Sequence, residues 1–166
     1  MSGRRWELPL ALLVGVLVRV PFWAEALRTP VDGDTAIIGL MARHPTWSAT
    51  MWGQPYGSPV EAWIAAPVFA LLRPDTATLR LVYFLLGLGL IPAVYALARA
   101  LDARAALPAA ILMACPSPYF LLLSALPPPM YPSALLLAAV VLALAFRLHA
   151  KLIAGESGRG DPGLDR

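Results

Sequence analysis

The sequence predicts an all-α integral membrane protein, and three observations lead to this fold class. Of the 166 residues, 59% are hydrophobic and only 14% are charged, whereas about a quarter of the residues of a soluble domain are charged. The mean hydropathy is +0.68. Several uncharged stretches approach or exceed the roughly 20 apolar residues that a spanning helix needs. No basic patch interleaves with aromatic residues, so no nucleic-acid partner is expected.

Four transmembrane helices are expected, at about 7–25, 80–99, 105–123 and 133–149. The first stretch is apolar except for Arg19, and the second has no charge between Arg80 and Arg99. The uncharged run from Ala105 to Phe146 is too long for one span. Three successive prolines inside the segment SALPPPMYP divide it into two. A cleaved signal peptide is the alternative for the first stretch, but Pro21 to Trp23 make a poor approach to a cleavage site.

The long loop 26–79 is expected to lie outside the cytoplasm and to carry two interfacial helices, one at 35–43 that directly follows Asp34 and one at 62–72. The uncharged stretch 62–72 is short for a span, and counting it as one would move basic segments to the outside. Without it, the positive-inside rule places both termini in the cytoplasm. Residues 1–152 then form one transmembrane module, and the Gly-rich segment 153–166 is expected to be a disordered tail.

The outer loop opens with DGDTAIIGLMARH, in which two carboxylates precede a short helical pattern. Ile37, Leu40, Met41 and His44 follow helical spacing, so they are expected to form one apolar face. Asp34 stands where an N-cap residue would, with its carboxylate at the positive end of the helix. A purely structural cap is the alternative reading of Asp34, and a tight turn is the alternative reading of the whole acidic motif.

Three pieces of the sequence resemble a known family. DTAIIGLMARH, GQPY and GSPVEAW follow one another after the first span and lead into a ladder of further spans. In this they resemble the GT-C membrane glycosyltransferases, and most nearly the bacterial dolichyl-phosphate-mannose–protein mannosyltransferase-like group. The resemblance implies a transferase of the bacterial inner membrane. Its donor is a polyprenyl-phosphate-linked sugar, and transfer to the acceptor takes place at the extracytoplasmic face.

The resemblance also assigns roles to residues. Asp34 occupies the position of the catalytic base, which takes a proton from the acceptor hydroxyl as this attacks the sugar. Thr35 stands where the family usually has a second acidic residue, so either Asp32 compensates from the other side of Gly33 or the site is weakened. The residues expected to bind donor or acceptor are Asp32, Arg19, Arg43, His44, Trp52, Gln54, Tyr56 and Glu61. Neither a cofactor nor a metal is predicted, because a lipid-phosphate donor has no diphosphate bridge that demands a metal.

The chain is shorter than the resemblance leads one to expect, since GT-C enzymes normally carry many more spans. We therefore expect an N-terminal part of such an enzyme, whose partners are the lipid-linked donor, membrane lipids and the remainder of the enzyme. Whether this part is active alone stays open. The alternative is a noncatalytic four-helix membrane protein that binds lipid or acts as a scaffold. A small transporter subunit is disfavoured, because the last three spans contain no charged residue between the charges that flank them.

Overall fold

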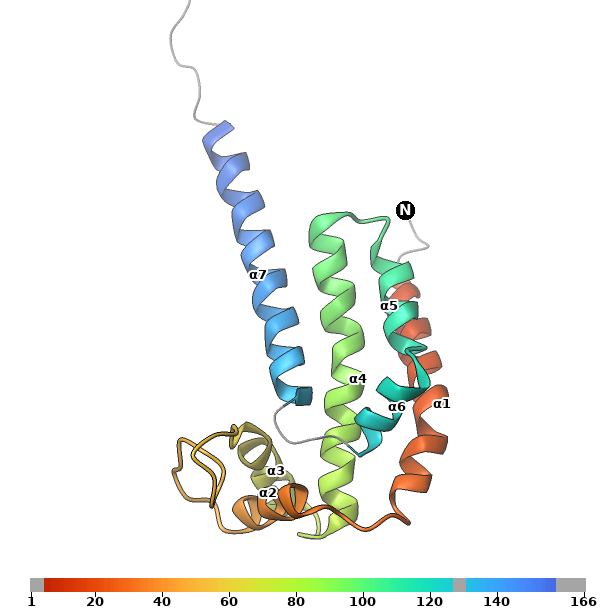
Figure 1. The fold of residues 1–166 in the computed structure, drawn as a ribbon. Helices are drawn as coiled ribbons and strands as arrows, with labels where there is room; N and C mark the ends of the chain where they lie inside the picture. The colour runs from red at the N-terminus through yellow and green to blue at the C-terminus, as the bar shows by residue number, and fades with distance from the viewer. Residues whose placement is uncertain (1–4, 127–130, 158–166) are drawn as a thin grey trace, which may run out of the picture.

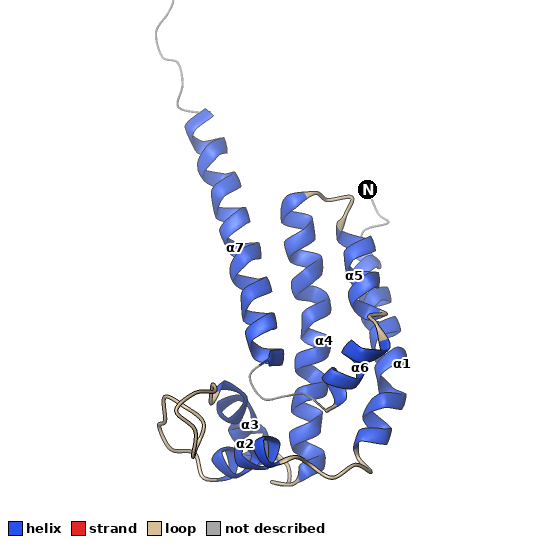
Figure 2. Ribbon diagram, viewed as in Figure 1, coloured by secondary structure: helices blue, strands red, loops and turns tan. Residues whose placement is uncertain are grey.

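The computed structural model describes residues 5–126 and 131–157, and within these ranges the chain is helical and contains no strand (Figure 2). The helices are α1 (Glu7–Ala26), α2 (Gly33–Arg43), α3 (Val60–Leu71), α4 (Thr76–Leu101), α5 (Ala106–Ala114), α6 (Pro118–Ala125) and α7 (Tyr131–Ser157).

The long helices form a bundle, and the two helices of the first loop pack at one end of it (Figure 1). Helix α4 is central, because it contacts α1, α3, α5, α6 and α7. Helices α2 and α3 contact each other, and α3 joins them to α4. The start of α1 and the end of α7 both lie at the opposite end of the bundle (Figure 1).

Three helices among the described residues, α1, α4 and α7, are long and apolar enough to cross a membrane. They contain the spans expected at 7–25, 80–99 and 133–149, so these three predictions are confirmed as apolar helices. Large apolar side chains on α7 face outward, Leu137, Val141 and Leu144 among them. A helix that exposes apolar side chains on its outer faces is typical of a membrane span. Helix α7 continues to Ser157, past its expected end and into the predicted tail; residues 158–166 lie outside the described part.

The span expected at 105–123 is not one continuous helix. Two short helices, α5 and α6, replace it, with a break at Cys115 to Ser117. Pro116 and Pro118 lie on either side of Ser117; a proline cannot donate a helical hydrogen bond, and it disfavours a helical conformation in the residue before it. Ser117 then caps α6, since its hydroxyl oxygen accepts from the Phe120 N–H at 3.3 Å. Because α5 and α6 are both short, the expected count of four spanning helices is not confirmed. The prolines at 116 and 118 were the local signal for this break.

Small side chains allow α1, α4 and α5 to pack closely. Ala11, Ala106, Ala110 and Ala114 are buried in one cluster with Ile91 and Tyr95. Gly15 of α1 is in such close contact with α4 that an added Cβ would lie 2.2 Å from the Ile91 side chain. Small residues of this kind are enriched where membrane helices meet, because lipid supplies no hydrophobic drive between them.

A second core joins the first-loop helices to α4. Ile38 and Met41 of α2, Ala65 and Phe69 of α3, and Val82 of α4 are buried together in it. The two expected helices of this loop are therefore present, but the predicted face of α2 is wrong in part. Its buried residues are Thr35, Ile38, Met41 and Ala42, whereas Leu40 is 51% exposed. Contact with α3 and α4, rather than local spacing, selects the buried side of α2.

Candidate active site

Two aspartates begin α2, and the structure gives them different roles. Asp32, not Asp34, is the N-cap residue, and its carboxylate accepts from the Thr35 N–H at 2.7 Å. The Thr35 hydroxyl donates to the other oxygen of Asp32 at 3.2 Å. Asp32 has an extended backbone and stands three residues before Thr35, which is the geometry that N-capping requires. The prediction that Asp34 caps the helix is therefore wrong, and its carboxylate is free of that role.

Asp34 lies exposed in the first turn of α2 and accepts one hydrogen bond from a distant residue. The Gln54 amide donates from Nε2 to Asp34 Oδ1 at 2.9 Å. Gly53 and Gly57 on either side of this segment have φ angles of +75° and +88°, which other residues rarely adopt. The loop closes on itself where the Met51 N–H donates to the Gly57 carbonyl at 3.2 Å. This turn carries Gln54 to Asp34, so two segments singled out in the sequence meet here.

The aromatic residues of the same loop differ in exposure. Tyr56 is 64% exposed, whereas Trp52 is half-buried against the core beneath α2. The Trp52 N–H contacts the Met41 sulfur at 3.4 Å, which fixes the backbone at this point. Tyr56 is therefore open to a ligand on most of its surface, whereas Trp52 presents only part of its ring.

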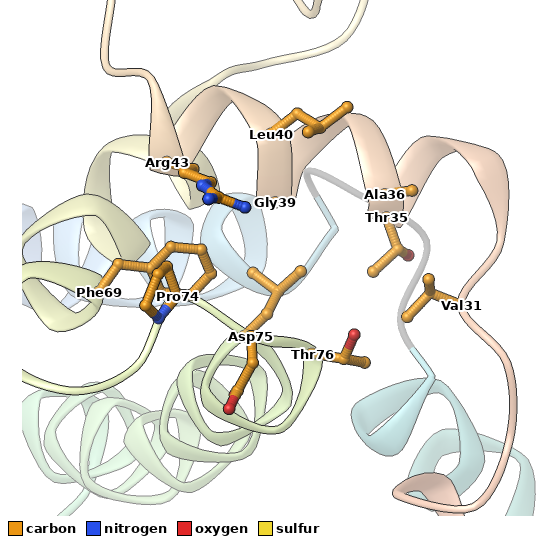
Figure 3. A pocket seen from close by; sticks show the side chains of 11 residues that line it. Val31, Thr35, Ala36, Gly39, Leu40, Arg43, Phe69, Pro74, Asp75 and Thr76 are labelled. Atoms are coloured by element: carbon orange, nitrogen blue, oxygen red, sulfur yellow. The ribbon is translucent and has the colours of Figure 1, made fainter.

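Arg43 and His44 lie at the other end of α2. Arg43 lines a pocket of about 310 Å³ between α2 and the start of α4, together with Thr35, Asp75 and Thr76. Figure 3 shows Arg43 and Thr35 on the α2 side, with Asp75 and Thr76 across from them. Asp75 caps α4, and the hydrogen bond from the Thr78 N–H to its carboxylate holds the pKa of that carboxyl below its usual range. Asp34 does not line this pocket, and His44 is exposed at the helix end.

Glu61 is fully buried, with 0% exposure, although it was expected to contact sugar. Its Oε1 accepts from the Ser133 hydroxyl at 2.6 Å and, at 3.4 Å, from the Ser133 N–H at the start of α7. The carboxylate therefore lies at a helix N-terminus, where a negative charge is favoured. Glu61 links α3 to α7, and a sugar would reach it only if these helices separated.

Arg19 is buried inside the bundle and has found partners on α5. Its guanidinium donates to the Ala114 carbonyl at 2.9 Å and to the Met113 carbonyl at 2.7 Å. These carbonyls end α5, just before the break, and have no helical partner of their own. A planar guanidinium suits two neighbouring acceptors. Arg19 thus satisfies the end of the broken helix, and its expected contact with a donor lipid stays a prediction.

Arg80 and Tyr83, near the start of α4, were not among the residues predicted from the sequence. Arg80 is 2% exposed and Tyr83 is 1% exposed, and both line a small cavity with Asp32 and Thr35. Arg80 donates through Nη2 to the Thr29 carbonyl in the segment that leads to α2. From the sequence, Arg80 was interpreted only as the charged residue at the start of a span. Arg80 and Tyr83 are three residues apart, and this spacing was the signal that they share one face of the helix.

Acidic and basic side chains at this end of the bundle do not form a metal-binding cluster. Within residues 5–126 and 131–157, no group of three or more His, Cys, Asp or Glu side chains lies together. What the described residues bring together at the start of α2 is the exposed carboxylate of Asp34 and the amide of Gln54 that donates to it.

Comparison with known proteins adds one finding. The family model of dolichyl-phosphate-mannose-protein mannosyltransferase matches residues 54–154, which is more than half of the chain. The match begins at Gln54 and covers α3 to α7, so it includes the partner of Asp34 but not Asp34 itself. No curated protein and no solved structure matches the chain. With its three apolar helices of spanning length, the chain is an integral membrane protein that belongs to the dolichyl-phosphate-mannose-protein mannosyltransferase family.

Proposed function

We propose that this chain forms part of a GT-C membrane glycosyltransferase that transfers a sugar from a polyprenyl-phosphate-linked donor to an acceptor hydroxyl. The family to which it belongs supports the reaction type and the lipid-linked donor. Asp34 acts as the general base of the transfer. The observation that carries this role is that Asp32 caps α2, so that Asp34 is exposed and is not engaged in capping.

The surroundings of Asp34 suit a base. Among the described residues its hydrogen-bond partner is the neutral amide of Gln54, which orients the carboxylate without neutralising its charge. The exposed position allows an acceptor hydroxyl to approach within hydrogen-bond reach, which a general base requires. The match to the family model begins at Gln54, so the residue that donates to Asp34 lies within the matched region.

The leaving lipid phosphate needs cationic groups or hydrogen-bond donors near the membrane surface as charge develops on it. Arg43 and His44 lie exposed at the far end of α2 and are the proposed donors. Tyr56, also exposed, is a candidate for hydrogen bonding to the sugar. The guanidinium of Arg19 is already engaged by two carbonyls, so it is the weakest of the proposed donor contacts.

We place α2 and α3 at the extracytoplasmic face of the inner membrane and both termini in the cytoplasm. The start of α1 and the end of α7 lie at one end of the bundle, opposite α2 and α3 (Figure 1). By chain order, Arg5 precedes α1, Arg99 and Arg104 flank the end of α4, and Arg147 and Lys151 belong to the second half of α7. These basic residues support this orientation through the positive-inside rule.

The test replaces single aspartates with asparagine in membranes where sugar transfer from the lipid-linked donor can be measured. Asp34→Asn keeps the shape of the side chain and removes its basicity, so transfer is expected to fall by about 10²- to 10⁴-fold. Asp102→Asn is the matched control, because Asp102 is an exposed aspartate at the C-terminal end of α4, and transfer should stay near the wild-type level. Equal transfer by Asp34→Asn and wild type would reject Asp34 as the base.

A further inference from the structure

Arg80 carries a buried charge that its visible contacts do not satisfy. It lies in the second turn of α4, at 2% exposure, and its Nη2 donates to the Thr29 carbonyl. The other terminal nitrogen, Nη1, is buried and has no hydrogen-bond partner among the described residues. A buried charged group without partners is costly, so native structures rarely leave one.

Tyr83 lies one turn further along α4 and presents a second unsatisfied group. It is 1% exposed, and its hydroxyl has no hydrogen-bond partner within the described residues. Arg80, Tyr83, Asp32 and Thr35 line the same cavity, whose volume is about 20 Å³. A polar cavity of that size holds one water molecule, which needs two to four polar partners. Two free donors and one carboxylate meet this requirement.

We propose that Arg80 is a positioning residue for the Asp34 helix, acting with a single bound water that joins Arg80, Tyr83 and Asp32. This inference rests on the proposed function, because its value to the enzyme is the placement of the base. Arg80 fixes the segment before α2 through Thr29 and fixes the cap of α2 through the water. Asp34 follows that cap by two residues, so its backbone is fixed from the side of α4.

Such a connection matters because few other contacts fix the first turn of α2. The residues through which α2 enters the core, Ile38, Met41 and Ala42, lie in its middle and last turns. At the first turn the Asp32 carboxylate accepts from Thr35, and the Ala36 N–H donates to the Asp32 carbonyl at 3.0 Å. These bonds are local to α2, whereas Arg80 is a contact from another helix. A base displaced by as little as 1 Å loses much of its effectiveness.

Hydrogen exchange tests the positioning without any need for activity. In the full chain in lipid nanodiscs, Arg80→Met should raise the exchange rates of the Thr35 and Ala36 amides by about tenfold, which corresponds to roughly 1.4 kcal/mol. Tyr83→Phe removes one partner of the water alone and should raise them by a smaller factor. Amides in the middle of α4 should not change. Arg28→Gln is the matched control, because Arg28 is exposed after the end of α1 and its guanidinium pairs with Glu25 in the last turn of that helix.

Kinetics separate positioning from binding of the donor phosphate. If Arg80 positions the base, Tyr83→Phe and Arg80→Lys lower kcat and leave the KM for the lipid donor unchanged. A raised KM with unchanged kcat would show that Arg80 holds the donor, and would overturn the proposal. Unchanged exchange at Thr35 and Ala36 in both Arg80→Met and Tyr83→Phe would overturn it as well. Failure of Asp34 as the base shows in Asp34→Asn and leaves the exchange result untouched, so the two failures are distinguishable.

Discussion

The clearest structural prediction concerns Arg19 and the end of α5. Arg19→Met keeps a long apolar side chain in α1 and removes the guanidinium. The carbonyls of Met113 and Ala114 then lose donors at 2.7 Å and 2.9 Å inside a buried part of the bundle. Because Pro116 follows within two residues, no backbone N–H is placed to replace them. We therefore expect the variant to be less stable.

The size of the effect follows from the two lost bonds. Hydrogen bonds between helices in a bilayer contribute about 0.6 kcal/mol on average and up to about 1.7 kcal/mol. Two bonds therefore give a loss of about 1–3 kcal/mol in the free energy of unfolding. Relief from burying the charge opposes this loss, which places the expected value toward the lower part of the range. Arg19→Lys retains the charge but not the planar fork, so it should lie between wild type and Arg19→Met.

Unfolding equilibria in mixed detergent micelles measure this difference. Arg28→Gln serves as the control, since Arg28 and Glu25 have side chains 80% and 72% exposed and their contact of 3.5 Å is worth at most about 1 kcal/mol. Equal stability of Arg19→Met and wild type, under conditions where a cavity variant in the same helix registers a loss, would refute the reasoning. The guanidinium would then contribute no more than it costs to bury.

Three further predictions concern other parts of the chain. Glu61→Ala and Ser133→Ala should each destabilise the protein, and the double variant should cost less than the sum of the two, because both remove the same bond at 2.6 Å; a double-mutant cycle of unfolding free energies checks this. The pKa of Asp75 is lowered in the folded state, so its contribution to stability is present above its unfolded value of about 3.9 and is lost as the pH falls through the folded value. Asp75→Ala should therefore lower the thermal midpoint at neutral pH and have little effect at the acid end of a titration, and an equal effect at every pH would contradict the assignment. Cysteines placed at Ser48 and Ala103 in a cysteine-free background should react with an impermeant reagent from outside and inside respectively, and labelling of both from one side would contradict the orientation.

The membrane character of the chain and three of its long helices were readable from the sequence, because apolar runs need no partner to be recognised. Three successive prolines predicted a break in the run 105–146; they lie at 127–129, outside the described residues, and α6 ends before them at Ala125 while α7 begins after them at Tyr131. The same rule applied to Pro116 and Pro118 would have predicted the division of α5 from α6. The division of α5 from α6 was therefore predictable from these two prolines, without knowledge of the tertiary structure.

The roles of individual charged residues were settled by tertiary structure. Asp32 and Asp34 can each cap a helix, and the backbone conformation at Asp32 decided between them. The partners of Arg19 lie 94 and 95 residues later in the chain, and Ser133 lies 72 residues after Glu61. No local pattern links residues so far apart, because their meeting depends on how the helices pack.

The sequence by itself thus determined the three apolar helices of spanning length, the place of two short helices in the first loop, and the motif that contains the candidate base. Hydropathy, proline chemistry and a family resemblance are properties of short segments, so they can be recognised without knowing how the helices pack. Only the tertiary structure showed that Asp32 caps α2, that Gln54 donates to Asp34, and that Arg80 of α4 donates to the Thr29 carbonyl in the segment before α2. These outcomes depend on the distances between helices, and packing alone sets those distances.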